Sequence, residues 1–566
     1  MSRRSSASTS SSGRALNRRI RLLLLVFALA FAVTLGRAAW LQGVRGSSYE
    51  SLALAQQRET IELPAGRGTI FDRTGEPLAI GEQTTTVFAD PRTIVDRRKV
   101  AIAVGKSLGL NPDVVYNELT DTSKGFVYLA RKADPIAAAS LEKLDLRGLG
   151  FISEEKRTYP QRGVAAQVIG YAGTDNHGLE GLESSLESTL AGRPGSETLV
   201  KDLYGRAVDV VTSRPELRGR NVTLTIDHQI QANAEAILAQ TVQRWHAKGG
   251  SAIVLDPRTG QVLAMANAPG FDSNAFPTAK PESRRNRAVT DLYEPGSTFK
   301  LVTISAALED GVVTPRTRFT LQPTIHVADR VIHDAETRPT ERMSVAEILT
   351  RSSNVGTVTI AERLGPDELA RWIARWGFGR TTGVDFPGES AGLVLPLDQW
   401  SGSTIGTVPI GLGIAVTPMQ MAAAYAAIAN GGVRATPHLI QKIGTRRVRV
   451  GQGRRIVSQA TARKVMTMLR DVVVQGTGTA AAIPGYTVAG KTGTANKPTS
   501  HGYSTSKYVA SFVGIVPAKH PRAVVLVMID EPKGAIWGGV VAAPAFQKIA
   551  QFDLQYLAVP PDAPSH

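Results

Sequence analysis

The stretch SAIVLDPRTGQVLAMAN, residues 251–267, places two apolar runs on either side of the turn residues PRTG. Apolar runs of this length, joined by a turn that contains Pro and Gly, predict a β-hairpin. Just before it, QIQANAEAILAQTVQRW (residues 229–245) carries apolar side chains at helical spacing, among them Ile230, Ala234 and Leu238. This segment is therefore expected to be a helix with one buried face.

Three more strand-like runs and a helix lie near the end of the chain. The runs are YTVAGKTGTA, YVASFVGIV and AVVLVMID, and the helix is expected from about Val541 to Leu557. Two strands and a helix thus open a domain that three strands and a helix close, so we expect both ends to pair in one antiparallel sheet. The prediction is an α+β domain with a helical subdomain inserted between the two halves of its sheet.

The preceding region, residues 42–220, is rich in strand and turn signals. RGTIFDRTGEPLA (residues 67–79) has a short β-run followed by a turn, and GLEGLE and AGRPG come later. Its acidic and basic residues are interspersed, and none of them forms a pattern that suggests chemistry. We therefore predict a pedestal or interaction domain.

Composition excludes several kinds of site. The 566 residues include no Cys, which rules out thiol nucleophiles, disulfides and cysteine-ligated metal sites. The nine His residues are scattered, and the nearest pair, His326 and His333, lacks the spacing of a helical zinc motif. No metal and no cofactor are predicted.

The first 41 residues have the pattern of a membrane anchor. Residues 1–21 combine six Arg with a Ser-rich stretch and no acidic residue, which predicts a disordered basic tail in the cytoplasm. Residues 22–41 are apolar apart from Arg37 and would span about 30 Å as a helix, enough to cross a bilayer. Basic residues before the helix favour a cytoplasmic N-terminus, which places the rest of the chain outside the plasma membrane.

A cleaved signal peptide is the alternative to a retained anchor, because Ala28-Leu29-Ala30 offers a cleavage site.

The chain has 65 Lys and Arg against 49 Asp and Glu, a net charge of +16. Because most of the chain is expected outside the cytoplasm, we assign this charge to topology and to a surface that faces anionic wall or membrane. No nucleic-acid partner is predicted.

A candidate nucleophile lies in EPGSTFKLVTISAALEDG, where a helix is expected after Pro295 and Gly296. Ser297 and Lys300 are three residues apart and would share one face of its first turn. A lysine can take the proton of a serine only if burial or nearby positive charge lowers its pKa. The S-x-x-K pattern is weak alone, since it recurs at Ser140/Lys143 and Ser504/Lys507.

Two further motifs follow in order. Ser352 and Asn354 form S-x-N after a helix-like MSVAEIL, a pattern that by itself could be a loop cap. Lys491, Thr492, Gly493 and Thr494 form K-T-G-T on one of the closing strands. Lys and Gly suit an exposed edge strand, and they also suit a strand that an extended peptide must join.

The order S-x-x-K, S-x-N, K-T-G resembles the penicillin-binding proteins and serine β-lactamases. RGTIFDRTGEPLA, RNRAVTDLYEPGSTFK, KTGTANK, KYVASFVGIVPA and IDEPKGAIWGGVVAAPAF narrow the resemblance to class B, division-specific transpeptidases of the FtsI type. The likeness extends over roughly residues 20–557. It implies a peptidoglycan D,D-transpeptidase that cross-links stem peptides of the septal wall and releases D-Ala.

The resemblance also implies a role for each motif residue. Ser297 would attack the penultimate D-Ala carbonyl while Lys300 accepts its proton, and the backbone N–H groups of Ser297 and Thr494 would form the oxyanion hole. Ser352 would pass a proton to the leaving amine, and Asn354 would orient Lys300. The donor carboxylate would bind Lys491 and the hydroxyls of Thr492 and Thr494, with Gly493 leaving room for the peptide.

The expected architecture runs from an anchor to an elongated pedestal and then a transpeptidase domain. The boundaries are residues 1–21 (tail), 22–41 (anchor), 42–220 (pedestal of the penicillin-binding protein dimerisation type), 221–557 (transpeptidase) and 558–566 (C-terminal tail). Implied partners are stem peptides with an amine acceptor, penicillin and other β-lactams, a SEDS-type (FtsW-like) glycosyltransferase and other division proteins of the membrane. The division site is the implied location.

Three alternatives remain. A catalytically idle scaffold of the division machinery would need none of the three motifs intact, and all three are complete. A β-lactam sensor or hydrolase is disfavoured because no E-x-x-L-N element follows Asn354 before Gln399. An elongation-specific transpeptidase differs in cellular role rather than in chemistry, and whether the acceptor amine is diaminopimelate or lysine stays open.

Overall fold

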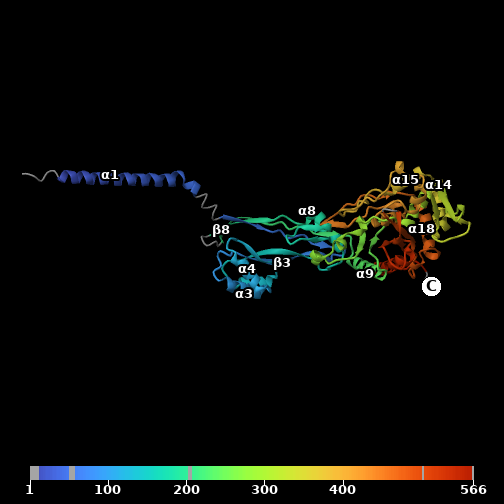
Figure 1. Ribbon diagram of the computed structural model, residues 1–566, viewed down its shortest axis with the longest axis horizontal. Helices are drawn as coiled ribbons and strands as arrows, with labels where there is room; N and C mark the ends of the chain where they lie inside the picture. Colours follow the sequence, from blue (N-terminus) through green and yellow to red (C-terminus); the bar gives the residue numbers. More distant parts are fainter. Residues whose placement is uncertain (1–11, 50–57, 202–206, 500–501, 564–566) are drawn as a thin grey trace, which may run out of the picture. The chain divides into compact units, whose positions relative to one another are not determined.

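The computed structural model describes residues 12–49, 58–201, 207–499 and 502–563 (Figure 1). The chain divides into two compact units, one made of Met1–Ala65 and Arg193–Leu217 and the other of Gly66–Gly192 and Arg218–His566. Each is described by itself.

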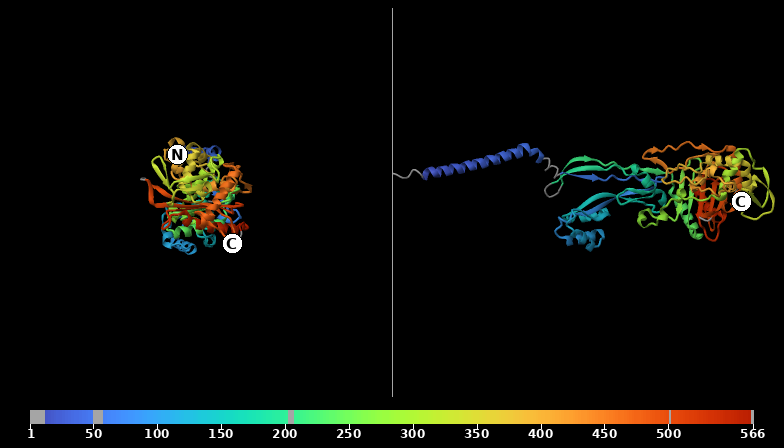
Figure 2. Two further views of the ribbon diagram at one scale, coloured as in Figure 1. Left: turned by 90° about the vertical axis from the view of Figure 1, so that its right-hand side faces the viewer. Right: turned by 45° about the horizontal axis from the view of Figure 1, so that its top comes forward.

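The first unit contains the long apolar helix. Helix α1 (Ser12–Ala39) continues into a short π-helix, η1 (Trp40–Val44), and Figure 2 shows α1 as one continuous rod. Among the described residues, one helix, Leu16–Val44, is long and apolar enough to cross a membrane, with a mean hydropathy of 2.2. It contains the predicted span of residues 22–41.

The prediction of a disordered tail up to residue 21 is wrong in part. The helix begins at Ser12, so the basic residues from Arg14 onward are helical. Arg and Leu are good helix formers, and a helix that is already nucleated extends at little further cost. The beginning of the predicted tail, residues 1–11, lies outside the described residues.

The same unit holds an antiparallel sheet in the order β1-β8-β9. Its strands are β1 (Arg58–Leu63), β8 (Gly195–Lys201) and β9 (Ala207–Arg214).

The second unit begins with RGTIFDRTGEPLA, where the predicted β-run and turn form a hairpin between two antiparallel strands. After β2 (Ile70–Phe71), Asp72 closes the turn by accepting hydrogen bonds from the backbone N–H of Thr74 (2.7 Å) and Glu76 (2.9 Å). Its other oxygen contacts His228 Nδ1 at 2.6 Å, which ties the hairpin to the start of helix α9 (His228–Arg244). The hairpin belongs to a sheet in the order β19-β18-β10-β2-β3-β4, with β5 also on β3. These strands are β2 (Ile70–Phe71), β3 (Pro77–Ala89), β4 (Val127–Ala133), β5 (Leu149–Thr158), β10 (Val222–Leu224), β18 (Ile440–Ile443) and β19 (Arg446–Arg447).

Buried charges hold this region together. Glu183, fully buried, accepts from Arg67 Nε and from Arg157 Nε, each at 2.6 Å. Gly68 lies so close to the segment before residue 222 that a Cβ would be 2.1 Å from the carbonyl oxygen of Arg220. The RGT and GLEGLE segments therefore serve packing.

A separate small core surrounds α3 (Arg97–Leu108), α4 (Pro112–Thr120) and α5 (Pro135–Glu142). Shorter elements are α6 (Ala166–Ile169), β6 (Tyr171–Ala172), β7 (Gly178–Glu180), α7 (Gly181–Ser185) and α8 (Glu187–Leu190).

The predicted antiparallel sheet is confirmed, with strand order β12-β11-β23-β22-β21. Its strands are β11 (Gly249–Leu255), β12 (Val262–Ala268), β21 (Ala489–Thr499), β22 (Gly502–Val516) and β23 (Ala523–Asp530). In Figures 1 and 2 the green residues near α9 lie beside the red C-terminal residues, because β11 pairs with β23 along its whole length. The two ends of the domain thus form one sheet.

Both faces of the sheet are covered. Helices α9 (His228–Arg244) and α20 (Ala543–Tyr556) pack on one face, where Val525 and Val527 of β23 point. Val524 and Leu526 point to the other face, into the core formed with the inserted helices. Burial on both faces explains why β23 is a continuous apolar run without polar alternation.

The inserted helical subdomain is also confirmed. Its main helices are α12 (Lys300–Glu309), α13 (Val345–Thr350), α14 (Asn354–Leu364), α15 (Pro366–Trp376), α17 (Pro418–Ala429) and α18 (Gln459–Gln475). Small two-stranded sheets pair β13 (Arg318–Leu321) with β16 (Glu341–Ser344), β14 (Thr324–Val327) with β15 (Arg330–His333), and β17 (Val433–Arg434) with β20 (Arg454–Arg455). Of these pairs, β14 and β15 form a hairpin. Short helical segments are η2 (Ser273–Thr278), α10 (Pro281–Arg284), α11 (Arg287–Thr290), η3 (Gly296–Phe299), η4 (Leu397–Gln399), α16 (Thr404–Thr407), η5 (Val408–Ile410), η6 (Thr479–Ala481) and α19 (Gly538–Val541).

Candidate active site

Ser297 lies in a 3₁₀ turn directly before α12. The turn is η3, and the N–H of Lys300, the first residue of α12, donates to the Ser297 carbonyl. In a 3₁₀ turn the side chains at i and i+3 lie above one another, so Ser297 and Lys300 share a face as predicted. Gly296 has φ +54° and its N–H donates to the carbonyl of Gly411 at 3.0 Å, which fixes the entry to the turn.

The three predicted motifs meet at Ser352. Lys300 Nζ donates to the Ser352 carbonyl oxygen (2.6 Å) and to Asn354 Oδ1 (2.7 Å), and it lies 3.3 Å from Ser352 Oγ. From the opposite strand, Lys491 Nζ donates to Ser352 Oγ at 2.9 Å. A single hydroxyl therefore lies between two lysine amines that are 191 positions apart in the chain.

The backbone at Ser352 is unusual. Its φ is +59°, a left-handed conformation that a residue with a Cβ adopts at a cost of about 1–3 kcal/mol. The conformation allows the chain to turn sharply between α13 and α14, so that Ser352 faces Lys300. Ser353 then caps α14, with its Oγ accepting from the N–H of Gly356 at 3.0 Å. The S-x-N motif is thus a helix cap, as the structural alternative predicted, and it is also part of the cluster of Lys300, Ser352 and Lys491.

Burial changes the protonation of both lysines. Burial lowers the pKa of Lys300 well below its ordinary value, the charge of Lys491 lowers it further, and Asp334 opposes the shift. Burial also lowers the pKa of Lys491, to about 7. A lowered pKa increases the neutral fraction of a lysine amine, and the neutral amine is able to act as a general base.

The K-T-G-T motif lies on β21, the edge strand of the sheet. Thr492 and Thr494 point to the same face because side chains alternate along a strand. Thr492 Oγ1 is 2.8 Å from Thr477 Oγ1, and Thr494 Oγ1 accepts from the N–H of Gly538 at 3.1 Å. The side of β21 away from β22 has no partner strand among the described residues, so an extended peptide could pair there.

Gly493 packs against the nucleophile turn. A Cβ at this position would lie 2.4 Å from Ser511 Oγ and 2.8 Å from the carbonyl oxygen of Pro295. The sequence-based reason for this glycine was room for a peptide. The structure adds a different one, because the protein itself occupies the space beside Gly493.

The hydroxyl of Ser297 forms no hydrogen bond with any described residue, and the amine of Lys300 is held by Ser352 and Asn354. The direct contact expected between Ser297 and Lys300 is therefore not formed in this state. Catalytic hydrogen bonds are often long in an unliganded site and shorten when substrate binds.

The other two S-x-x-K matches do not form such a cluster. Ser140 is exposed on α5 and donates to the carbonyl of Ile136 in its own helix. Lys507, the partner of Ser504, is about half exposed and lies 3.9 Å from Glu531. Both patterns are ordinary surface residues.

Sequence reasoning missed three residues of this region. Thr477, in the segment after α18, contacts Thr492, and its only sequence signal is a small-residue stretch, GTGTA. Asp334, between β15 and β16, accepts from the backbone N–H of Asn354 in the S-x-N motif, and Arg338 donates to Asp334. Neither residue belongs to a sequence motif. Nothing in their local sequence distinguishes them from surface charges.

Comparison with known proteins agrees with this geometry. The chain matches the penicillin binding protein transpeptidase domain over residues 250–551 and the penicillin-binding protein dimerisation domain over residues 62–224. It is 36% identical to the probable peptidoglycan D,D-transpeptidase PenA of Neisseria gonorrhoeae (97% of this chain, 94% of that protein). It is 34% identical to the peptidoglycan D,D-transpeptidase FtsI of Escherichia coli K12 (96% and 93%). The crystal structure of penicillin binding protein 3 of Mycobacterium tuberculosis, complexed with aztreonam, superposes with a TM-score of 0.71 at 33% identity (89% of this chain, 99% of that one).

The fold and the site define a serine-type acyltransferase of the penicillin-binding class, with a dimerisation-type domain before the transpeptidase domain. The chain belongs to the class B penicillin-binding proteins of the FtsI and PenA type, and it is a peptidoglycan D,D-transpeptidase. The predicted family, fold class and enzymatic activity are confirmed.

Proposed function

We propose that Ser297 is the acylated nucleophile of this transpeptidase and that Lys300 is its base. The observation that carries the proposal is the Ser352 hydroxyl, held between the amines of Lys300 and Lys491 at 3.3 and 2.9 Å. Such an arrangement brings a base, a proton relay and a carboxylate-binding cation to one side of the turn that bears Ser297. General-base assistance of this kind typically contributes about 10²- to 10⁴-fold in rate.

In the acylation half-reaction, Ser297 Oγ attacks the carbonyl of the penultimate D-Ala while neutral Lys300 accepts its proton. The backbone N–H groups of Ser297 and Thr494 stabilise the oxyanion, and one such donor is worth about 3–4 kcal/mol. The proximity of the two segments supports this pair, since a Cβ at Gly296 would lie 2.8 Å from the carbonyl oxygen of Thr494. Ser352 then passes the proton to the departing amine, and D-Ala leaves.

The donor peptide is held by its terminal carboxylate. Lys491, protonated when the carboxylate binds, and the hydroxyls of Thr492 and Thr494 supply charge-assisted hydrogen bonds. An anion next to Lys491 raises the pKa of that amine again, so substrate binding itself favours the protonated form. In the second half-reaction, a side-chain amine of another stem attacks the acyl-enzyme and forms the cross-link.

A fluorescent penicillin tests the nucleophile, because a β-lactam resembles the D-Ala-D-Ala end and should acylate Ser297. The wild type is expected to be labelled and Ser297→Ala is not, while the control Ser504→Ala, in another S-x-x-K match, is labelled like the wild type. Mass spectrometry should place the adduct on the peptide that contains Ser297. Labelling of Ser297→Ala at the wild-type rate would contradict the proposal.

We propose further that the enzyme acts at the division septum, with a cytoplasmic N-terminus and residues 42–566 outside the plasma membrane. The resemblance to FtsI supports the septal role, and the arginines between Arg14 and Arg21 support the orientation. A SEDS-type glycosyltransferase and other division proteins of the membrane are the proposed partners, through α1 and the pedestal. A tagged copy should concentrate at midcell, and a uniform side-wall pattern would favour the elongation role instead.

The proposed domain boundary is at about residue 220, between a pedestal of residues 42–220 and a transpeptidase domain of residues 221–557. The two family matches, which end at residue 224 and begin at residue 250, support a boundary in this region. Strand β10 pairs with β2 on one side and β18 on the other, so the two domains share a sheet at this boundary.

A further inference from the structure

The segment between β15 and β16 lies against the S-x-N turn, although no sequence motif marks it. Asp334 is its central residue. One carboxylate oxygen, Oδ1, accepts from the backbone N–H of Asn354 (2.5 Å) and Val355 (3.0 Å), and Oδ2 lies 2.9 Å from the hydroxyl of Ser353. The first N–H groups of a helix have no partner within the helix, and a carboxylate at this end also suits the helix dipole.

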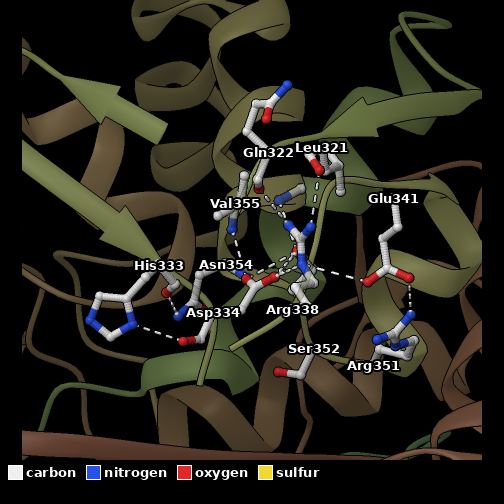
Figure 3. Close-up of polar contacts among 12 residues, drawn as sticks. Leu321, Gln322, His333, Asp334, Arg338, Glu341, Arg351, Ser352, Asn354 and Val355 are labelled. Carbon is white, nitrogen blue, oxygen red and sulfur yellow. Dashed lines mark hydrogen bonds and ion pairs between the residues drawn. The ribbon is translucent and has the colours of Figure 1, made fainter. Parts of the chain in front are cut away.

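Arg338 holds that carboxylate in place. Its Nε donates to Asp334 Oδ2 at 2.5 Å, while its two terminal nitrogens donate to the carbonyl oxygens of Leu321 and Gln322, each at 3.0 Å (Figure 3). Both charged side chains are nearly buried, with exposed fractions of 6% for Arg338 and 10% for Asp334. The rigid guanidinium fork therefore connects Asp334 to the end of β13.

The network continues to the amine of Lys300 through Asn354. Asn354 Nδ2 donates to the carbonyl oxygen of His333 at 2.9 Å, so its Oδ1 is directed at Lys300 Nζ, 2.7 Å away. The backbone of Asn354 is held by Asp334, and its side-chain amide is held by His333, the last residue of β15. The orientation of the Lys300 amine thus depends on where this segment lies.

We propose that Arg338 and Asp334 are positioning residues for the acylation step: their ion pair fixes the first turn of α14, so that Asn354 and Ser352 hold the Lys300 amine in the place where it serves Ser297. This inference rests on the proposed function, in which Lys300 is the base. Neither residue touches the reacting atoms in this arrangement, and both act through α14.

The ion pair also affects the proton affinity of Lys300. The charged groups around this amine are Lys491 from β21 and Asp334 and Arg338 from the segment before β16, with Glu341 3.7 Å beyond Arg338. Asp334 raises the pKa of Lys300 against the effects of burial and of Lys491. Loss of the Asp334 charge should lower the pKa of Lys300, whereas loss of Arg338 leaves an unpaired carboxylate and should raise it.

The test is the second-order rate of acylation by a penicillin, measured against pH for Arg338→Met, Asp334→Asn, the double variant and a control, Arg330→Met. Arg330 lies on β15, directly before the segment that holds Asp334 and Arg338, but its side chain is 60% exposed and its anionic neighbour, Asp329, is 3.7 Å away. Displacement of a catalytic group by about 1 Å is able to cost on the order of 10²-fold. We expect losses of about 10- to 100-fold for Arg338→Met and Asp334→Asn and none for Arg330→Met.

Two readouts separate positioning from a merely structural role. The midpoint of the rising limb of the rate against pH should move to lower pH in Asp334→Asn and to higher pH in Arg338→Met. If Arg338 acts through Asp334, the double variant should be no slower than Asp334→Asn, because residues that act as a unit are not additive. Additive losses, or wild-type rates and midpoints in the folded single variants, would overturn the proposal.

Folding is followed by the thermal midpoint of each variant. If Arg338→Met does not fold, the double variant replaces it, because it leaves no unpaired buried charge. Its acylation rate is then compared with that of Asp334→Asn. Equal rates support the proposal, and a slower double variant overturns it. Failure of the proposed function would appear differently. Labelling of Ser297→Ala would remove the basis of the inference, whereas an unlabelled Ser297→Ala together with normal acylation by Arg338→Met would refute the inference alone.

Discussion

Two buried lysines in one cluster make this site unfavourable for stability and favourable for chemistry. Lys300 and Lys491 are both fully buried, and their cationic forms lose hydration, while no carboxylate of the described residues forms an ion pair with either amine. The protein tolerates this because Ser352 and Asn354 accept hydrogen bonds from the two amines. Groups with shifted pKa values are typical of catalytic clefts.

Replacement of Lys491 by Met should stabilise the fold and abolish acylation. The pKa of Lys491 is about 7 in the folded protein and about 10.5 when unfolded, so the buried amine destabilises the fold fully below pH 7 and progressively less up to pH 10.5. We expect Lys491→Met to raise the free energy of unfolding by about 1–3 kcal/mol at pH 7, with the gain shrinking as pH rises. Urea unfolding at pH 7 and 9.5 measures this, and an unchanged or lower stability at pH 7 would contradict the assigned burial cost.

Removal of the Ser352 hydroxyl should slow acylation without unfolding the protein. Ser352→Ala loses the group between the two amines, and we expect the acylation rate to fall by about 10²- to 10⁴-fold. Ser305→Ala is a matched control, because the Ser305 hydroxyl is also buried but donates only to the Val302 carbonyl of its own helix. Stopped-flow measurement with a fluorescent penicillin gives both rates, and equal rates would remove Ser352 from the proposed relay.

At the scale of elements, the site depends on three that come together from distant parts of the chain. The turn η3 precedes α12, the S-x-N turn separates α13 from α14, and β21 closes the sheet. Local sequence pattern predicted a helix at α12, a helix-like segment at α13 and a strand at β21, whereas α14 was expected only as part of a helical insertion. Their mutual approach depends on small residues, notably Gly296 and Gly493, where the backbones nearly touch.

A methyl group at Gly493 should push β21 away from the nucleophile turn. The Cβ of Gly493→Ala would lie 2.4 Å from Ser511 Oγ and 2.8 Å from the Pro295 carbonyl oxygen, well inside contact distance. We expect a loss of stability of about 1–3 kcal/mol. Acylation should be at least about tenfold slower, since the strand also bears Lys491.

Gly270→Ala is the control for this strand substitution, because a Cβ at Gly270 has no neighbour within 4 Å. Thermal unfolding and penicillin acylation are measured on both variants. If Gly493→Ala acylated as fast as Gly270→Ala, close contact between β21 and the turn would not matter for the reaction.

At the scale of the whole molecule, the described residues combine an apolar helix, a pedestal-type region and a transpeptidase domain. None of the proposed catalytic residues lies in the described part of the pedestal-type region, and its characteristic segments serve packing instead. Glu183 is the clearest example, since its carboxylate is shared by Arg67 and Arg157 away from solvent. A buried ion cluster of this kind is a poor source of net stability but is costly to break.

Loss of the Glu183 charge should therefore destabilise the protein without affecting the reaction. Glu183→Gln leaves Arg67 and Arg157 with less compensation, and we expect a fall of about 3–5 kcal/mol in the free energy of unfolding. Glu187→Gln, at a side chain that is 33% exposed, should cost about 1 kcal/mol or less. Urea unfolding compares the two, and the folded fraction of each should be acylated by penicillin at the wild-type rate.

Local patterns in the chain were enough to predict the α+β class, the antiparallel sheet, the helical insertion and the apolar span, as well as the motif residues that meet at Ser352. These depend on periodicity and on motif order, which are properties of short segments. The start of α1 was predicted at residue 22 instead of Ser12, because the basic, Ser-rich composition of this region favoured disorder although it also contains helix-forming residues.

The remaining features of the site were decided by the tertiary structure alone. The 2.9 Å contact from Lys491 to Ser352, the burial that lowers both lysine pKa values, and the contacts of Thr477, Asp334 and Arg338 join segments that are far apart in the chain. Such contacts depend on strand register and on which surfaces exclude water, and neither leaves a periodic mark in the residues involved. For that reason Asp334 and Arg338 look like ordinary surface charges until the fold places Asp334 at the start of α14 and pairs Arg338 with it.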